Sequence, residues 1–412
     1  MTESVAALLA RIALEDRAIG AFWSLAAKDA TAEGALSGMT LGVKDNLDVA
    51  GLPTTAGIAA FRHRVATADA PAVAGLRRAG AVLLGKLAMH EGALGATNDT
   101  PGFGRCMNPL RTGYTPGGSS GGSGAAVAAG FVTLAIGTDT MGSVRIPAAY
   151  CGVVGLKPTA GLVSRAGVVP LSPSLDHVGM LAATPRLAAL GLEAMVGEDP
   201  ADPMSRPAPA GWHAVPRAPL RGAGLRLGRP ILDATMEPAI RAAWDAAATR
   251  ARALGADVQD IAMPGWEPSA ARRAGLLLIE AEAAALHPHL IEDANAASPG
   301  FRAALAYGRD AGTTRLMRAI FRLAEARGAM LRALDGCDAL LLPTAPQRAF
   351  PHGTPAPADQ ADFCALANIA GLPAIAFPWP AADGGLPCSI QLIGRPHEEA
   401  KLVGLAEALT AP

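Results

Sequence analysis

The chain has few aromatic residues, few cysteines and no long apolar run, and each absence excludes a class of protein. Aromatic residues make up 4% of the 412 residues, so stacking platforms for nucleic-acid bases are not expected. The five cysteines are widely spaced and form no Cys-x-x-Cys pair, which argues against a zinc site or a redox dithiol and fits a reducing compartment. The longest apolar run, residues 124–136, is interrupted by Gly130 and is shorter than the roughly 20 residues that span a bilayer.

Charge of one sign is also lacking. The formal net charge is −1, which gives no electrostatic reason to expect nucleic acid or an anionic membrane as a partner. The N-terminus carries Glu3, Arg11, Glu15 and Arg17 where a signal peptide would have an uninterrupted apolar run. We therefore expect a cytoplasmic protein with no nucleic-acid and no membrane partner, and we leave a homodimer open.

The chain is rich in short apolar runs that alternate with segments of helical periodicity. The predicted strands are residues 41–43, 81–85, 132–136, 225–228, 257–261, 339–343, 374–377 and 389–394. The predicted helices are residues 72–79, 125–129, 238–254, 269–286, 302–335 and 398–409. This alternation predicts an α/β fold in which helices cover both faces of a sheet. Residues 200–222 show little periodicity and are expected to form a long surface connection within a single domain, 1–412.

Two Gly-rich segments stand out. Residues 115–124 read Thr-Pro-Gly-Gly-Ser-Ser-Gly-Gly-Ser-Gly, and residues 137–145 read Gly-Thr-Asp-Thr-Met-Gly-Ser-Val-Arg. The first segment is not a P-loop, because Ser-Gly stands where Lys-Ser/Thr is required, and it also lacks the third glycine of a dinucleotide fingerprint. A nucleophile elbow needs a strand directly before it, whereas Tyr-Thr-Pro precedes this loop. A flexible linker would continue into polar sequence, but this loop opens a helix.

A lysine and two serines form the candidate catalytic set. A serine nucleophile needs a base, and a lysine held neutral can supply it. Lys44 follows an apolar strand in a chain with five lysines and 30 arginines, and a buried lysine can lose its proton whereas arginine cannot. Ser143 follows a buried strand in a turn, where several backbone N–H groups can point at one oxyanion. When each residue is considered alone, the commoner interpretation of Lys44 is a surface lysine, and that of Ser143 is an ordinary serine in a turn.

Further segments carry a family resemblance along nearly the whole chain. They are Gly-Val-Lys-Asp-Asn at 42–46, Cys-Gly-Val-Val-Gly-Leu-Lys-Pro-Thr at 151–159 and Gln-Leu-Ile-Gly-Arg-Pro at 391–396. Together with the two Gly-rich segments, they make the sequence resemble the amidase signature family of serine hydrolases. The resemblance implies the amidase-signature fold, with a large central mixed β-sheet covered by helices on both faces.

The resemblance also implies a role for each candidate residue. Ser143 would be the nucleophile that forms an acyl-enzyme, and Lys44 would be the base. Ser119, which in this family follows a cis peptide bond, would bridge the two. The backbone N–H groups expected to bind the oxyanion are those of Thr140, Met141, Gly142 and Ser143. Asp139 and Arg145 are expected to hold the loop. Many family members carry glycine at the position of Met141.

The expected activity is hydrolysis of a small-molecule carboxamide, a linear amide, to a carboxylate and ammonia or an amine, with no metal and no organic cofactor. The expected partner is a small-molecule amide substrate. One alternative is a glutamine-hydrolysing, tRNA-dependent amidotransferase subunit of the A type. Others are a hydrolase of urea-derived amides such as biuret or allophanate, and a catalytically inactive binding protein. Substrate specificity is expected to lie in residues 87–105 and 190–335.

Overall fold

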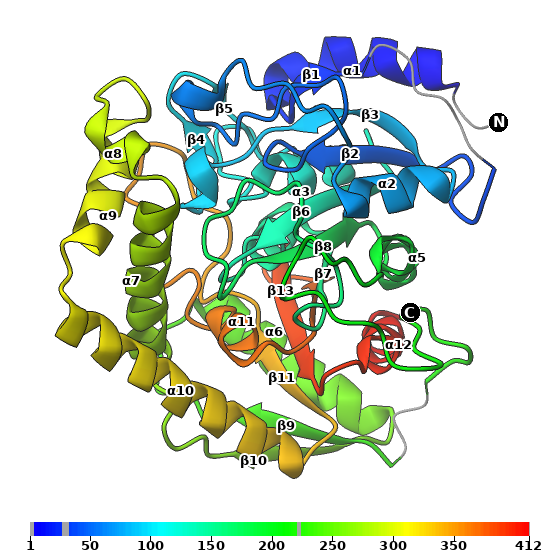
Figure 1. The fold of residues 1–412 in the computed structure, drawn as a ribbon. Helices are drawn as coiled ribbons and strands as arrows, with labels where there is room; N and C mark the ends of the chain where they lie inside the picture. The colour runs from blue at the N-terminus through cyan, green and yellow to red at the C-terminus, as the bar shows by residue number, and fades with distance from the viewer. Residues whose placement is uncertain (1–3, 27–32, 221–223, 412) are drawn as a thin grey trace.

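The fold is built on one large mixed β-sheet, shown as a ribbon in Figure 1. The computed structural model describes residues 4–26, 33–220 and 224–411. Within them, eleven strands form the sheet in the order β1-β3-β2-β6-β8-β7-β12-β13-β11-β9-β10. In that order the strands are Phe22–Leu25, Val82–Leu87, Thr40–Lys44, Leu134–Asp139, His177–Ala182, Val154–Lys157, Ala374–Trp379, Cys388–Gly394, Ala339–Pro343, Arg226–Pro230 and Asp257–Ile261. A separate two-stranded sheet pairs β4 (Asp99–Thr100) with β5 (Gly104–Arg105).

The sheet mixes the two strand directions. β2 is parallel to both of its neighbours, β3 and β6, and β9 is parallel to β10 and β11. The other pairs are antiparallel, including β6 with β8 and β12 with β13. The predicted α/β fold with a large mixed sheet is confirmed.

Helices pack on both faces of the sheet. On one face lie α2 (Pro71–Arg78), α5 (Pro185–Met195), α6 (Pro238–Ala253) and α12 (Glu399–Thr410). On the other face lie α1 (Val5–Ile19), α3 (Gly121–Ala128), α4 (Arg145–Cys151), α7 (Pro268–Leu286), α10 (Thr313–Asp335) and α11 (Ala365–Ala370). The short α8 (His289–Glu292) and α9 (Pro299–Arg309) extend the layer that α7 and α10 form, on the left in Figure 1.

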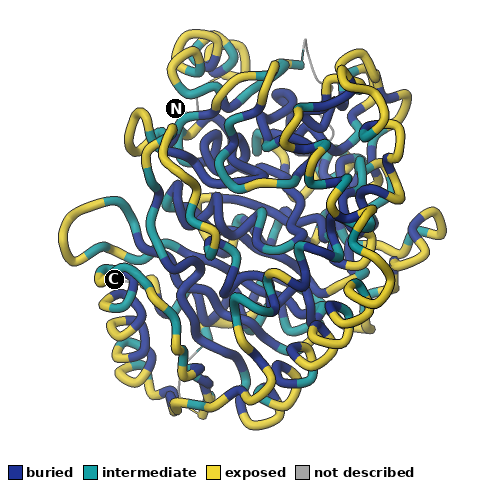
Figure 2. The backbone as a smooth tube through the Cα atoms, turned by 90° about the vertical axis from the view of Figure 1, so that its left-hand side faces the viewer, coloured by how far each residue is buried: buried dark blue, intermediate teal, exposed yellow. Residues whose placement is uncertain are grey.

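The continuous apolar runs of the sequence reflect this two-sided cover. In β11, Leu341 belongs to the core under α6 and α12, whereas Leu340 and Leu342 belong to the core under α7, α10 and α11. Successive side chains of a strand point to opposite faces, so a strand covered on both faces is apolar at every position. Figure 2 shows the result, with the buried residues gathered at the centre and the exposed ones at the margins.

Some predicted boundaries were wrong. The segment 302–335, predicted to be mostly helical, contains the end of α9 and all of α10, and Gly312 with φ +74° lies between them. The strand predicted at residues 132–136 is β6 in the structure, which begins two residues later, at Leu134, and ends three residues later, at Asp139. Residues 200–220 contain neither helix nor strand and connect α5 to β9 over a mostly exposed path, while 221 and 222 lie outside the described residues. The single domain stays a prediction.

The helices also bear on location. Within the described ranges, no helix combines the length and the apolar character needed to cross a membrane. The cytoplasmic location stays a prediction. Among the same residues, no three His, Cys, Asp or Glu side chains lie where they could hold a metal ion together.

Candidate active site

Two adjacent parallel strands bring the first candidate groups to one edge of the sheet. Lys44 is the last residue of β2, and Thr138 and Asp139 end β6. Because parallel strands end at the same edge, their C-terminal side chains can meet there. The Lys44 Nζ atom donates a hydrogen bond of 2.7 Å to Thr138 Oγ1, and Asn46 Nδ2 donates to the same oxygen at 3.1 Å. Thr138 and Asn46 were quoted in the sequence motifs but were given no role.

The serine loop supplies the second candidate group. The peptide bond between Gly118 and Ser119 is cis, as the resemblance implied. Ser119 Oγ accepts a hydrogen bond of 2.8 Å from Lys44 Nζ, and both side chains are completely buried. The Ser119 carbonyl is held by the backbone N–H of His90 at 3.0 Å. The structure therefore brings Lys44 and Ser119 together in one buried contact.

The turn that carries Ser143 lies against the same loop. The backbone N–H of Ser120 donates to the Ser143 carbonyl at 3.2 Å. Ser143 itself is half-buried and, together with Gly118, lines a cavity of about 340 Å³. Of the three predicted catalytic residues, Ser143 is thus the one that lines the cavity, whereas Lys44 and Ser119 are completely buried.

Burial changes the protonation of Lys44. Its complete burial lowers the pKa to about 7, although the charges of Asp139 and Asp176 oppose this shift. Among the described residues, no carboxylate forms an ion pair with Lys44. A large share of the side chain is therefore neutral near pH 7, and a neutral amine can accept a proton from Ser119.

Asp139 and Arg145 hold the backbone on both sides of Ser143. Asp139 accepts hydrogen bonds from the backbone N–H of Gly142 at 2.6 Å and from that of Val144 at 3.2 Å. The completely buried Arg145 pairs with Asp139 at 3.0 Å. Burial alone would raise the pKa of Asp139, but the Arg145 guanidinium outweighs it and holds this pKa well below its usual range. The carboxylate stays ionised, so it accepts these backbone N–H groups at any ordinary pH.

Two amides from distant segments complete this network. Arg145 also donates to Asn368 Oδ1 at 2.6 Å and to Gln391 Oε1 at 3.0 Å. Asn368 in turn donates to the Asp139 carbonyl at 2.8 Å. Gln391 stands in a quoted motif but was given no role, and Asn368 was missed. Both ends of the Ser143 turn are therefore tied to the C-terminal third of the chain.

The predicted set of oxyanion donors needs one correction. The N–H of Gly142 already donates to Asp139, so it is not free to bind an oxyanion in this conformation. Among the described residues, none accepts a hydrogen bond from the backbone N–H of Met141 or Ser143. The side chain of Thr140 is held by Asp176, whose carboxylate accepts the hydroxyl at 2.6 Å. The backbone N–H of Thr140 likewise has no acceptor among the described residues. Thr140, Met141 and Ser143 thus keep their N–H groups available, and their role as oxyanion donors stays a prediction.

The cavity beside Ser143 is mostly apolar and holds two charged side chains. The segments that line it include 93–96, 140–146, 272–280 and 357–361. The first and third of these fall in the ranges expected to carry specificity, and 357–361 was missed. The charged groups are Arg272 and Glu280, both on α7.

Those two charged groups differ in how they are held. Arg272 Nε donates to Asp362 Oδ1 at 2.6 Å. The two terminal nitrogens of the guanidinium do not bond to Asp362. Burial raises the pKa of Glu280 to about 7, and the charge of Arg315 offsets part of this rise. The cavity therefore offers one fixed cation and one carboxylate that ionises near neutral pH.

Met141 lies where many family members have glycine, and a glycine of α7 makes room for it. A Cβ atom added at Gly275 would lie 2.7 Å from Met141 Sδ. Met141 also packs against both hydrophobic cores that α7 joins. Its side chain thus fills the gap at Gly275 and links the turn before Ser143 to the helix that carries Arg272 and Glu280.

We expect Gly275→Ala to lower kcat/KM about tenfold, because overpacking by one methyl costs about 1–3 kcal/mol and the displaced side chain belongs to the turn before Ser143. Steady-state kinetics and Tm are measured for Gly275→Ala, Met141→Ala and the double variant. The double variant should be no worse than Met141→Ala, since the clash is gone. Gly300→Ala in α9 is the control, because a Cβ there meets nothing within 4 Å. Additive losses in the double variant would disprove the contact.

Comparison with known proteins identifies the class to which this fold and site belong. The Amidase family model matches residues 3–403, and the chain belongs to this family of enzymes, which act on C–N bonds. The A subunit of the glutamyl-tRNA(Gln) amidotransferase from Anaeromyxobacter dehalogenans (strain 2CP-C) is 39% identical over 460 aligned positions, covering 99% of this chain and 92% of the relative.

Comparison with solved structures supports the same family. The crystal structure of the A subunit of glutamyl-tRNA(Gln) amidotransferase from Thermotoga maritima has a TM-score of 0.87 and 30% identity, covering 98% of this chain and 89% of that one. An inhibitor-bound structure, described as a vestigial protein complex that reveals the evolutionary origins of an s-triazine catabolic enzyme, has a TM-score of 0.90 and 34% identity, covering 98% and 93%.

These relatives overturn one expectation from the sequence. A small-molecule amide as the only partner, with no nucleic acid, was wrong, because the relatives are named as subunits of an enzyme for glutamyl-tRNA(Gln). The net charge of −1 argues only against a dominant basic footprint on this chain. It carries no information on contacts with nucleic acid that other subunits of an assembly supply.

Proposed function

We propose that the chain hydrolyses the side-chain amide of glutamine as a subunit of an amidotransferase and releases ammonia for a partner. The observation that carries the chemistry is the buried contact of Lys44 with Ser119, in a loop whose next residue, Ser120, bonds to the carbonyl of Ser143 at the wall of the cavity. The relatives that are named as the A subunit of glutamyl-tRNA(Gln) amidotransferase support the substrate and the assembly.

The proposed proton path runs from Ser143 through Ser119 to Lys44, and the hydrogen bond of 2.8 Å between Lys44 and Ser119 supports its second step. The neutral amine of Lys44 takes the proton of Ser119, and Ser119 takes that of Ser143 as the Ser143 oxygen attacks the amide carbon. The backbone N–H groups of Thr140, Met141 and Ser143 stabilise the oxyanion that forms. The path then returns the proton to the leaving nitrogen, the C–N bond breaks and ammonia departs. Water hydrolyses the acyl ester at Ser143 by the same path.

The charges of the cavity fit a free amino acid. An α-carboxylate can pair with the terminal nitrogens of Arg272, and an α-ammonium can pair with ionised Glu280. The apolar remainder of the lining takes the methylene groups of the side chain. Because Ser143 lines the same cavity as these two residues, we expect such binding to present the amide, and not the α-carbon groups, to Ser143.

Ammonia release from glutamine, measured by a coupled assay, tests the proposal. We expect Glu280→Gln and Arg272→Gln to raise KM with little change in kcat, because they bind groups that do not react. Arg273→Gln, the exposed neighbour on the same helix, is the matched control and should behave as wild type. Glutamine left intact by a protein that still reacts covalently at Ser143 would disprove the substrate but not the chemistry.

A second candidate function is hydrolysis of a urea-derived amide such as biuret or allophanate. It is favoured by the likeness to a solved structure of allophanate hydrolase from Kluyveromyces lactis, which has a TM-score of 0.81 and 28% identity, covering 91% of this chain and 61% of that one. The same assay decides between them. Ammonia from biuret or allophanate, and none from glutamine, would establish this function instead.

A further inference from the structure

Helix α10 carries two apolar stripes on opposite sides, and only one of them is covered. The inner stripe packs on the core with α7 and α11 and comprises Ala319, Leu323, Ala326, Met330 and Leu334. The outer stripe comprises Met317, Phe321, Ala324, Gly328 and Leu331. Of its large side chains, Phe321 is 60% exposed, Leu331 40% and Met317 39%. A surface helix of a globular protein normally has only one such stripe.

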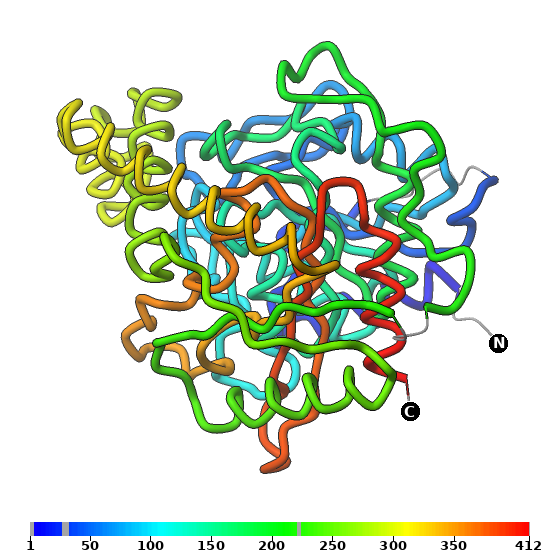
Figure 3. The backbone as a smooth tube through the Cα atoms, turned by 90° about the horizontal axis from the view of Figure 1, so that it is seen from below, coloured from blue at the N-terminus to red at the C-terminus, as the bar shows by residue number. Residues whose placement is uncertain are grey.

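The outer stripe has the spacing of a helix-pairing seam. Its residues follow one another at intervals of four, three, four and three, the repeat with which two helices pack side by side. The fourteen steps from Met317 to Leu331, at 1.5 Å each, give a seam roughly 21 Å long. α10 lies on the outer surface of the molecule in both Figure 1 and Figure 3, so a second helix has access to the whole length.

The flanks of the seam are strongly basic. Helix α10 carries five arginines after Thr314, at positions 315, 318, 322, 327 and 332, against two acidic residues, Glu325 and Asp335. Among the described residues, Arg318 forms no ion pair, and Arg322 has only Glu267 at 3.7 Å.

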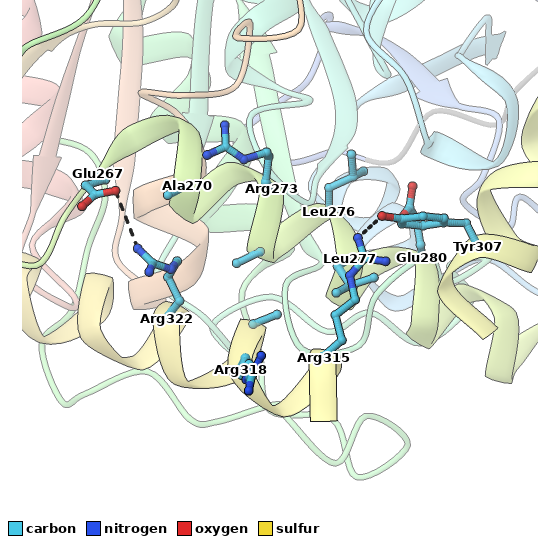
Figure 4. Close-up of a pocket in the computed structure, with 12 residues that line it drawn as sticks. Glu267, Ala270, Arg273, Leu276, Leu277, Glu280, Tyr307, Arg315, Arg318 and Arg322 are labelled. Carbon is cyan, nitrogen blue, oxygen red and sulfur yellow. Dashed lines mark hydrogen bonds and ion pairs between the residues drawn. The ribbon is translucent and has the colours of Figure 1, made fainter. Parts of the chain in front are cut away.

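A pocket of about 540 Å³ opens between α7 and α10 beside the seam. Figure 4 shows Arg315, Arg318 and Arg322 reaching it from α10 and Arg273 from α7. Only Glu267 and Glu280 provide carboxylates in its lining, so the pocket has space and positive charge for acidic side chains.

We propose that the outer face of α10 binds an acidic amphipathic helix of a different protein chain. Apolar side chains of that helix pack along Met317, Phe321 and Leu331, and its carboxylates pair with the arginines beside the seam and in the pocket. The relatives are named as subunits of a larger enzyme, and a subunit needs a surface that binds another chain. The inference does not depend on which amide the active site hydrolyses.

A second copy of this chain fits the surface less well. In a symmetric contact the same patch faces itself, so the arginines of one α10 would lie near those of the other. Like charges beside a helix-pairing seam destabilise it. An RNA partner would use the arginines but would leave the exposed Phe321 and Leu331 without apolar contacts.

The test uses the full-length protein and a fluorescein-labelled synthetic peptide of about three heptads, with leucine at a and d and glutamate at the flanking positions. Fluorescence anisotropy should give saturable binding to wild type, weakened at least tenfold by Phe321→Glu and by Arg318→Glu. Leu14→Glu is the matched control, because Leu14 is an exposed apolar residue of another helix, α1, at 68% exposure. It should bind as wild type, and ammonia release and Tm should be unchanged in all three variants.

Two further measurements test the chemistry and the identity of the partner. A peptide with lysine in place of glutamate should bind at least tenfold more weakly than the acidic one. Equal binding of the two peptides, or equal binding of the acidic peptide to wild type and Phe321→Glu, would overturn the proposal. Sedimentation that shows a wild-type dimer, converted to monomer by Phe321→Glu, would overturn it as well, since the occupant would then be a second copy.

Discussion

Ser143→Ala is expected to abolish both turnover and covalent labelling. The substitution removes the only cavity-facing hydroxyl of the proposed path, and loss of a nucleophile of this kind lowers kcat by about 10⁴-fold or more. Intact mass spectrometry after treatment with a fluorophosphonate should show one adduct on wild type and none on Ser143→Ala. This measurement needs no knowledge of the natural substrate, so it tests the nucleophile apart from the proposed reaction.

A second serine variant tests whether the reacting residues are correctly placed in the sequence. Ser120 is next to Ser119, but its hydroxyl donates to the Thr138 carbonyl at 3.2 Å and not to Lys44. Ser120→Ala should therefore keep the fluorophosphonate adduct. If Ser120→Ala lost the adduct and Ser143→Ala kept it, the assignment of the nucleophile would be wrong.

The sequence predicted best those elements whose apolar pattern is set by burial. The strand at 339–343, in which every residue is buried, was predicted with the bounds that the structure has. One element beside the site was missed. Helix α4, Arg145–Cys151, begins with a completely buried arginine and contains Pro147, so neither propensity nor periodicity indicates a helix there. What stabilises it is the pairing of Arg145 with Asp139, which is a tertiary contact.

The same difference separates the predicted and the missed residues of the site. Lys44, Ser119 and Ser143 stand in motifs that can be compared with a family. Arg272 and Glu280 stand in α7, whose sequence has only the pattern of an amphipathic helix, and Asp362 comes from a segment ninety positions away from Arg272. The hydrogen bond from the Gly142 N–H to Asp139 could not be predicted either, since the direction of a backbone group is not encoded by the residue's own side chain.

The structure also gives Met141 a place that sequence comparison could not. A methionine where many relatives have glycine suggested a narrowed pocket or a constrained backbone. Gly275 in α7 leaves the space that its sulfur needs, and these two positions lie far apart in the sequence. The missing side chain at position 275 makes room for the large one at position 141, and this is visible only once α7 is packed against the turn.

Replacement of Lys44 should be about as damaging as loss of the nucleophile, because residues of a proton path act as a unit. Lys44→Met removes the base and should lower kcat by about 10³-fold or more. Lys44→Arg should not restore activity, since a guanidinium keeps its proton at any working pH. Near-normal turnover of Lys44→Arg would show that position 44 needs only a cation.

The pH dependence of the wild type should report the same group. The active form of Lys44 is neutral, and burial lowers its pKa to about 7, so kcat/KM should rise with pH through about 7 and level off above it. Lys157 is also completely buried, with its pKa lowered to about 7, and burial raises the pKa of Glu280, the proposed partner of the α-ammonium, to about 7, so the profile needs an assignment. The rise should persist in Glu280→Gln. Incorporation of thialysine, a less basic amine, at position 44 should move the midpoint to lower pH, whereas the same change at position 157 should leave it in place. A midpoint that follows position 157 would contradict Lys44 as the base.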